Sequence, residues 1–133
     1  DCVLLIMAAL SDSEAKEFFD IATSLSMDTL FEVHDDMELE RALSLSPQMV
    51  GVNNRNLKTL EVSLETGLAL SRKMSKGILK VAESGIENRE SLQAFHAQGF
   101  EAFLIGESLM KSPDIGAATR AILTTIDTEQ EQV

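Results

Sequence analysis

Five short apolar segments recur along the chain, and none shows a clean alternation of apolar and polar residues. They are Val3–Met7, Leu30–Val33, Met49–Val52, Ile78–Ala82 and Ala102–Ile105. Segments of this length that are apolar on both faces are typical of parallel strands that are covered on both sides. The pattern therefore predicts five buried parallel strands.

Helical patterns separate these segments, and several begin with a capping signal. Ser11 and Glu14 form a capping box, in which the hydroxyl and the carboxylate each bind a free backbone amide. The apolar residues that then recur at helical spacing are Ala15, Phe18, Phe19, Ala22 and Leu25. The polar residues expected at the starts of the next three helices are Asp35, Ser63 and Asn88. Strands and helices thus alternate.

The last helix is expected near Asp114–Ile126, and the polar tail 127–133 is expected to fray. Strict alternation of strand and helix, five times over, implies a parallel sheet with right-handed crossovers. Successive strands begin about 20 to 30 residues apart, which fits a (β/α)₈ barrel and equally fits a doubly wound sheet. The pattern leaves both folds open, and five units are fewer than the eight of a barrel.

Length and composition narrow the class of protein. The 133 residues fit one domain or a part of one, and 44% hydrophobic residues are enough for a buried core. The net charge of −11 argues against binding of nucleic acid or an anionic membrane through bulk charge. The single cysteine, Cys2, excludes an internal disulfide and favours a cytoplasmic location. Because the sequence begins with Asp1 rather than Met, directly before a predicted strand, we expect a longer polypeptide upstream.

Polar residues concentrate directly after four of the predicted strands. Glu32 and His34 end the second strand, and the segments Asn53–Asn56, Glu83–Gly85 and Gly106–Ser108 end the next three. Functional sites of parallel α/β folds gather at the carboxyl ends of their strands. Four consecutive strand ends of this kind predict a site along this edge of the sheet.

The last two strand ends have the composition of a phosphate-binding site. Gly85 and Gly106 let the backbone come close to a ligand, and Ser84 and Ser108 offer hydroxyls. A short helix beginning after Gly106 would present free amides to an anion. We expect the Glu107 side chain to point away from the anion while its amide donates. The alternative, that both glycines only shape turns, stays open at this point.

Glu32 and Glu83 are the candidate acid and base. Partial burial at apolar strand ends would raise their pKa values and suit them to proton transfer. The alternative is a structural ion pair, with Arg55 as the partner. His96 is expected at the surface of a helix, while His34 lies either on the strand face of Glu32 or in the following loop. No His, Cys and Asp cluster has the spacing of a metal site, so no metal is expected.

The residues at these strand ends resemble a known family. The segments that carry the resemblance are Phe31–Asp35, Gly51–Leu57, Val81–Ile86 and Leu104–Met110. They resemble strands five to eight of the indole-3-glycerol phosphate synthase family, and Val3–Ile6 resembles its fourth strand. The resemblance covers nearly the whole chain in order. It implies that residues 1–133 are the C-terminal part of one TIM (β/α)₈-barrel domain, here an incomplete barrel of five units.

The family closes the indole ring of 1-(2-carboxyphenylamino)-1-deoxyribulose 5-phosphate with loss of carbon dioxide and water, without a metal or organic cofactor. The resemblance implies that Glu32 is a general base and that Glu83 holds the substrate and the catalytic cation in register. It implies that Asn53 and Arg55 orient the substrate, and that Ser84 also contacts it. The residues implied to bind phosphate are Ser84, Gly85, Gly106, Glu107 and Ser108.

The family also uses lysines on its first and third strands, which this chain does not contain. None of its own lysines is expected at a strand end facing the site; these are Lys16, Lys58, Lys73, Lys76, Lys80 and Lys111. The chain alone is therefore expected to be inactive, with a phosphorylated small molecule as the enzyme's ligand. Alternatives are a fragment that only binds phosphate and an interaction module. The apolar edges Val3–Met7 and Ala102–Ile105, without charge or proline, are expected to favour self-association.

Overall fold

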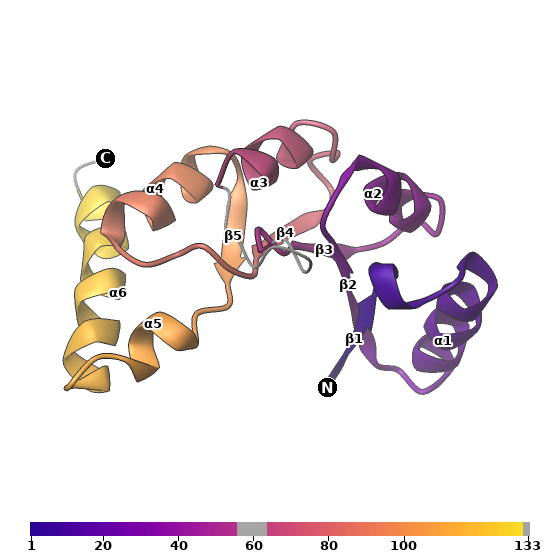
Figure 1. Ribbon diagram of the computed structural model, residues 1–133, viewed down its shortest axis with the longest axis horizontal. Coiled ribbons are helices and arrows are strands. Elements are labelled where there is room, and N and C mark those ends of the chain that lie inside the picture. The colour runs from indigo at the N-terminus through magenta and orange to yellow at the C-terminus, as the bar shows by residue number, and fades with distance from the viewer. Residues whose placement is uncertain (56–63, 132–133) are drawn as a thin grey trace.

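The computed structural model describes residues 1–55 and 64–131, and its centre is a five-stranded sheet (Figure 1). The strands are β1 (Cys2–Ile6), β2 (Asp28–Val33), β3 (Met49–Val52), β4 (Leu79–Ala82) and β5 (Phe100–Phe103). They lie in the order β1-β2-β3-β4-β5, and all four neighbouring pairs are parallel. Because the order in space follows the order in the chain without a reversal, the sheet is part of a barrel and not a doubly wound sheet.

The helices follow the strands in the predicted alternation. They are η1 (Met7–Ala9, a 3-10 helix), α1 (Asp12–Ser24), α2 (Asp36–Leu43), α3 (Leu64–Ser71), α4 (Arg89–Ala97), α5 (Glu107–Met110) and α6 (Ile115–Glu131). The capping box of Ser11 and Glu14 is present. Asp35 and Asn88 cap α2 and α4 by accepting backbone amides. Ser63 and Lys58 lie outside the described residues.

Helices α1 to α4 pack on the face of the sheet that carries the aromatic core. Phe31 of β2 contacts Phe19 of α1 with ring centroids 5.1 Å apart, and Phe100 of β5 meets Phe95 of α4 edge-on at the same separation. Phe31, Phe95 and Phe100 are fully buried. Large aromatic side chains bury the most apolar area, so these contacts fix the helices on the sheet.

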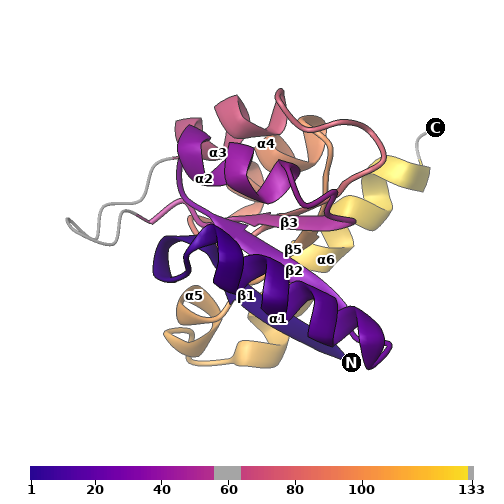
Figure 2. The ribbon, with the colours of Figure 1, turned by 90° about the vertical axis from the view of Figure 1, so that its right-hand side faces the viewer.

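The other face of the sheet is partly exposed. Leu4 pairs with Leu30 and Met49 pairs with Leu79, so these residues share the face that also carries Glu32 and Gly51. Leu4 is 46% exposed and Leu79 is 37% exposed. In a closed barrel this face is filled by side chains from all eight strands. Leu30 and Glu32 on the same face are only 9% and 8% exposed. In Figure 2, α2, α3 and α4 lie together on one side of β3, and α5 lies on the other side.

Several predicted boundaries differ from the structure. The ends of β1, β2 and β4 differ from the predicted ones by one or two residues. Strand β5 begins at Phe100, two residues before its predicted start, because Phe100 packs on Phe95. The strand therefore includes the exposed Glu101, and the prediction that this edge carries no charge is wrong. Helix α6 continues to Glu131, past its predicted end at Ile126; fraying of 127–133 stays a prediction. In the described parts of the chain no helix is long and apolar enough to cross a membrane.

Candidate active site

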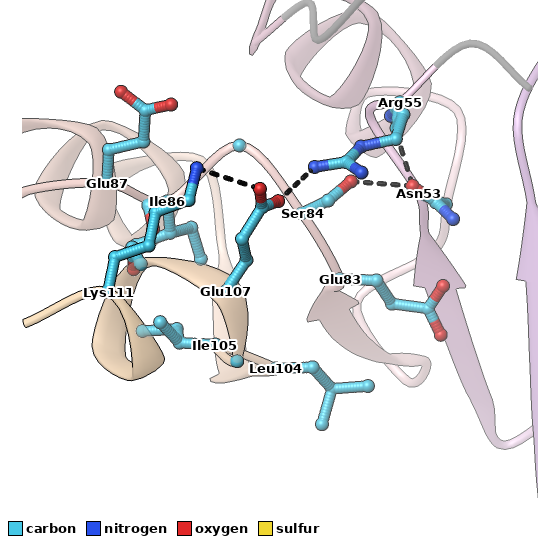
Figure 3. Close-up of a pocket in the computed structure, with 13 residues that line it drawn as sticks. Asn53, Arg55, Glu83, Ser84, Ile86, Glu87, Leu104, Ile105, Glu107 and Lys111 are labelled. Carbon is cyan, nitrogen blue, oxygen red and sulfur yellow. Dashed lines mark hydrogen bonds and ion pairs between the residues drawn. The ribbon is translucent and has the colours of Figure 1, made fainter. Parts of the chain in front are cut away.

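A cleft of about 630 Å³ lies at the carboxyl ends of β3, β4 and β5 (Figure 3). Its lining residues are Asn53, Arg55, Glu83, Ser84, Gly85, Ile86, Glu87, Leu104, Ile105, Gly106, Glu107, Ser108 and Lys111. Eight of the nine candidate site residues therefore line one cleft. The ninth, Glu32, lies next to Glu83 at the end of β2.

Asn53 links the ends of β3 and β4. Its Oδ1 atom accepts hydrogen bonds from the Ser84 hydroxyl at 2.6 Å and from the Arg55 backbone amide at 3.0 Å. Because the oxygen accepts both, the Nδ2 group of Asn53 is left to donate to a ligand in the cleft. The sequence predicted both Asn53 and Ser84 as ligand contacts, and the structure adds that each orients the other.

Asn54 is a structural residue of the site that sequence reasoning did not single out. It is 3% exposed, and its Nδ2 group donates to the Ser84 backbone carbonyl at 2.7 Å. A Cβ atom at Gly67 of α3 would lie 2.4 Å from Asn54 Oδ1, so the glycine makes room for this side chain. Asn54 thus fixes the start of the Ser84–Gly85 turn relative to β3.

Glu107 does not point away from the cleft, contrary to the expectation. Its carboxylate lies between two cations, with Arg55 Nη2 at 2.6 Å and Lys111 Nζ at 2.9 Å (Figure 3). The hydrogen bond from Arg55 and then the one from Lys111 lower the pKa of Glu107 to about 2. Arg55 therefore pairs with Glu107, and not with Glu32 or Glu83 as the structural alternative required.

Lys111 is a cleft residue that the sequence prediction excluded. It follows α5 and stands four residues after Glu107, a spacing that brings side chains together on a helix. This spacing was the signal available in the sequence. Lys80 lies inside β4, as expected, and so does not reach the strand end.

The two glycines of the predicted phosphate site differ. Gly85 has a φ of 86°, a conformation that glycine adopts without strain, so the turn itself requires it. A Cβ atom at Gly106 would meet no atom within 4 Å, so space beside the backbone lies open there. Ser108 Oγ donates to the Ile86 carbonyl at 3.2 Å and thus joins α5 to the β4 end. The turn explanation holds for Gly85 only.

Glu83 points away from the Arg55, Glu107 and Lys111 cluster (Figure 3) and lies on the Gly51 side of the sheet. A Cβ atom at Gly51 would lie 2.5 Å from Glu83 Oε1, so glycine makes room for the carboxyl group. Both Glu83 oxygens are buried without a hydrogen-bond partner in the described structure. Burial, and then the neighbouring Glu32 carboxyl, raise the pKa of Glu83 to about 9.

We expect Glu83 to titrate near pH 9 in the folded protein. The pKa of Glu83 is higher in the folded protein than its ordinary value of 4.5. Glu83 therefore contributes its full share to the stability of the fold below pH 4.5, and this contribution is lost as the pH rises toward 9. The ¹³C chemical shift of the Glu83 carboxyl carbon measures the midpoint. Glu32→Gln removes the neighbouring charge and should lower the titration midpoint of Glu83. A midpoint near 4.5 in the unsubstituted protein would contradict this prediction.

The two histidines occupy different environments. His96 is exposed on α4, as predicted, with Nδ1 3.3 Å from the Phe100 carbonyl. His34 follows the last residue of β2 and is largely buried beside Glu32 and Glu38. Among residues 1–55 and 64–131, no group of three or more His, Cys, Asp or Glu side chains is placed to hold a metal ion.

The sequential parallel sheet and the cleft at its carboxyl edge define part of a (β/α)₈-barrel protein with its site at the strand ends. The solved structure of thiamine phosphate pyrophosphorylase from Pyrococcus furiosus has the same fold, with a TM-score of 0.72 over 96% of this chain and 60% of that chain at 19% identity. The native KDPGal structure is similar, with a TM-score of 0.67 over 98% of this chain and 60% of that one, at 15% identity.

Sequence comparison identifies the family. The model of the family described as indole-3-glycerol phosphate synthase matches residues 1–122. The protein of that name from Azospirillum brasilense is 49% identical over 92% of this chain and 47% of its own length. The protein of the same name from Acidovorax sp. (strain JS42) is 51% identical over 89% of this chain and 44% of its own length. The chain belongs to the indole-3-glycerol phosphate synthase family, and it spans about half the length of these relatives.

Proposed function

We propose that the protein containing this sequence is an indole-3-glycerol phosphate synthase, a lyase of tryptophan biosynthesis that acts in the cytoplasm. Its substrate would be 1-(2-carboxyphenylamino)-1-deoxyribulose 5-phosphate, which closes to the indole with loss of carbon dioxide and water. The observation that carries the proposal is the pairing of Glu32 and Glu83 at the same end of the sheet as a cleft lined by Arg55 and Lys111.

The two carboxyl groups suit proton transfer. With a pKa of about 9, Glu83 is neutral near pH 7 and can donate a hydrogen bond to the substrate. Glu32 is 8% exposed, so a proton that it accepts is shielded from water. Two neighbouring carboxyl groups, one of them held neutral by burial, are typical of acid and base pairs. We assign the general base to Glu32 and substrate positioning to Glu83.

The other end of the cleft suits a phosphate group. The backbone at Gly85 and Gly106 and the first amides of α5 would donate to its oxygens, while Asn53 Nδ2 and Arg55 would bind the remainder of the substrate. Arg55 and Lys111 supply positive charge that attracts the anion even though the chain as a whole is acidic. No metal or organic cofactor is part of this proposal.

The described strands supply a base but no lysine at a strand end. A general acid typically contributes about 10²–10⁴-fold to the rate, so residues 1–133 alone should turn over the substrate at or near background. Turnover by a chain that also contains the upstream β/α units of the family is therefore the test. Formation of the fluorescent indole product measures it. A folded full-length protein that binds the substrate and forms no indole would overturn the proposal.

A further inference from the structure

His34 belongs to a buried row of three side chains, Glu38, His34 and Glu32. Their side chains are 14%, 11% and 10% exposed, respectively. His34 Nδ1 lies 3.0 Å from Glu38 Oε1, and His34 Nε2 lies 3.7 Å from Glu32 Oε2. The row therefore runs from the first turn of α2, through the imidazole, to the carboxylate to which we assign the base.

Glu38 is turned toward His34 and away from its ordinary capping role. At the third position of a helix, a glutamate commonly accepts the backbone amide of the N-cap residue, here Asp35. Glu38 Oε1 instead accepts the backbone amide of His34 at 3.0 Å, together with Nδ1 of its ring. Two contacts on one residue hold the plane of the imidazole.

This contact determines which ring nitrogen carries the proton. The Glu38 carboxylate only accepts hydrogen bonds, so Nδ1 must be protonated, and Nε2 of the neutral ring keeps its lone pair. His34 Nε2 is buried and has no hydrogen-bond partner in the described structure. A buried nitrogen of this kind needs a donor, and the neighbouring side chain that can supply one is Glu32, once Glu32 carries a proton.

We propose that His34 is a positioning residue for Glu32 that also receives the proton which Glu32 takes from the substrate. The substrate bond to hydrogen breaks, its electron pair stays on the substrate, and an O–H bond forms on Glu32. That proton then passes to the lone pair of His34 Nε2, and Glu38 stabilises the resulting imidazolium. Glu32 is thereby restored as a carboxylate. The inference rests on the proposed function, because it needs Glu32 as the base.

The alternative is that Glu38 and His34 only end β2 and begin α2. Such a structural role would require the contact of His34 Nδ1 with Glu38, and it would not require His34 Nε2 to accept a proton. His34→Asn separates the two explanations, since the asparagine amide can replace the Nδ1 donor to Glu38 and cannot replace Nε2. The matched control is His96→Asn, the same change at an exposed histidine outside the cleft. The titratable groups that face His34 are Glu32 and Glu38, and Glu83, which directly follows β4, adjoins Glu32.

The experiment compares these variants in the full-length protein that contains this sequence. We expect His34→Asn to lower kcat by about 10–100-fold, the range for groups that orient a reactive group, with KM changed by less than about threefold and thermal stability kept. His96→Asn should leave kcat unchanged. Wild-type kcat in His34→Asn, or a loss of kcat only in proportion to lost folded protein, would overturn the inference.

A second readout does not depend on turnover. The ¹⁵N chemical shifts of the His34 ring in the unsubstituted protein should show Nδ1 protonated and Nε2 unprotonated near neutral pH, and Glu38→Gln should weaken this preference. An Nε2-protonated ring would overturn the inference. A full-length protein without any turnover would overturn the proposed function itself. An active protein whose kcat is unchanged by His34→Asn would overturn only the proposed proton transfer from Glu32 to His34.

Discussion

Glu32→Gln in the full-length protein is expected to lower kcat by about 10²–10⁴-fold, with a smaller change in KM. Glutamine keeps the shape of the side chain at the end of β2, where it is 8% exposed, and cannot accept the proton. An interaction that acts mainly in the transition state affects kcat more than substrate binding. Steady-state rates of indole formation measure both constants.

Glu17→Gln is the matched control for this substitution. Glu17 is exposed in the middle of α1, and the same change there should leave kcat and KM as they are. A Glu32→Gln protein that folds and keeps the kcat of the unsubstituted enzyme would show that Glu32 is not the base. That result would also remove the basis for a relay through His34.

The isolated 133-residue chain is expected to self-associate or to remain partly molten, mainly through β1. This strand pairs only with β2 among the strands described, and residues Cys2–Ile6 carry no charge or proline to discourage further pairing. Leu4 on its open face is 46% exposed. At the other edge, Glu101 in β5 opposes pairing. Sedimentation of the purified chain measures its mass.

Two variants and the salt concentration sharpen this test. Leu4→Lys places a charge on the open edge and should shift the chain toward monomer, whereas Met37→Lys, on the exposed side of α2, should not. The net charge of −11 repels copies from one another, so added salt should increase association. A monodisperse 14.5 kDa species with a cooperative thermal transition would contradict the prediction.

The sequence predicts those features of the fold that depend on neighbouring residues. Strand β3 has its predicted bounds, and Ser11, Asp35 and Asn88 cap their helices as expected, because a capping bond joins residues three apart. The start of β5 is predicted two residues late because it depends on the contact of Phe100 with Phe95. That contact exists only after the helix has packed on the sheet.

The candidate site likewise has features that the sequence predicts and features that only the folded structure determines. That the residues after β3, β4 and β5 meet in one cleft follows from the parallel direction of the strands. Which charges pair within the cleft does not follow, because Arg55 and Glu107 come from different units and only the fold brings them to 2.6 Å. The burial of Asn54 likewise depends on the close approach of Gly67 in α3.

The sequential order of the strands also bears on how the chain folds. Each strand pairs with the strand of the next unit, so every pairing joins segments that are close together in the sequence. Short loops cost less entropy to close, and folds built from contacts between nearby segments form faster. A sheet of this kind can grow by adding one unit at a time to an edge. Its assembly can therefore follow the direction of synthesis on the ribosome, with each new strand docking on the one made before it.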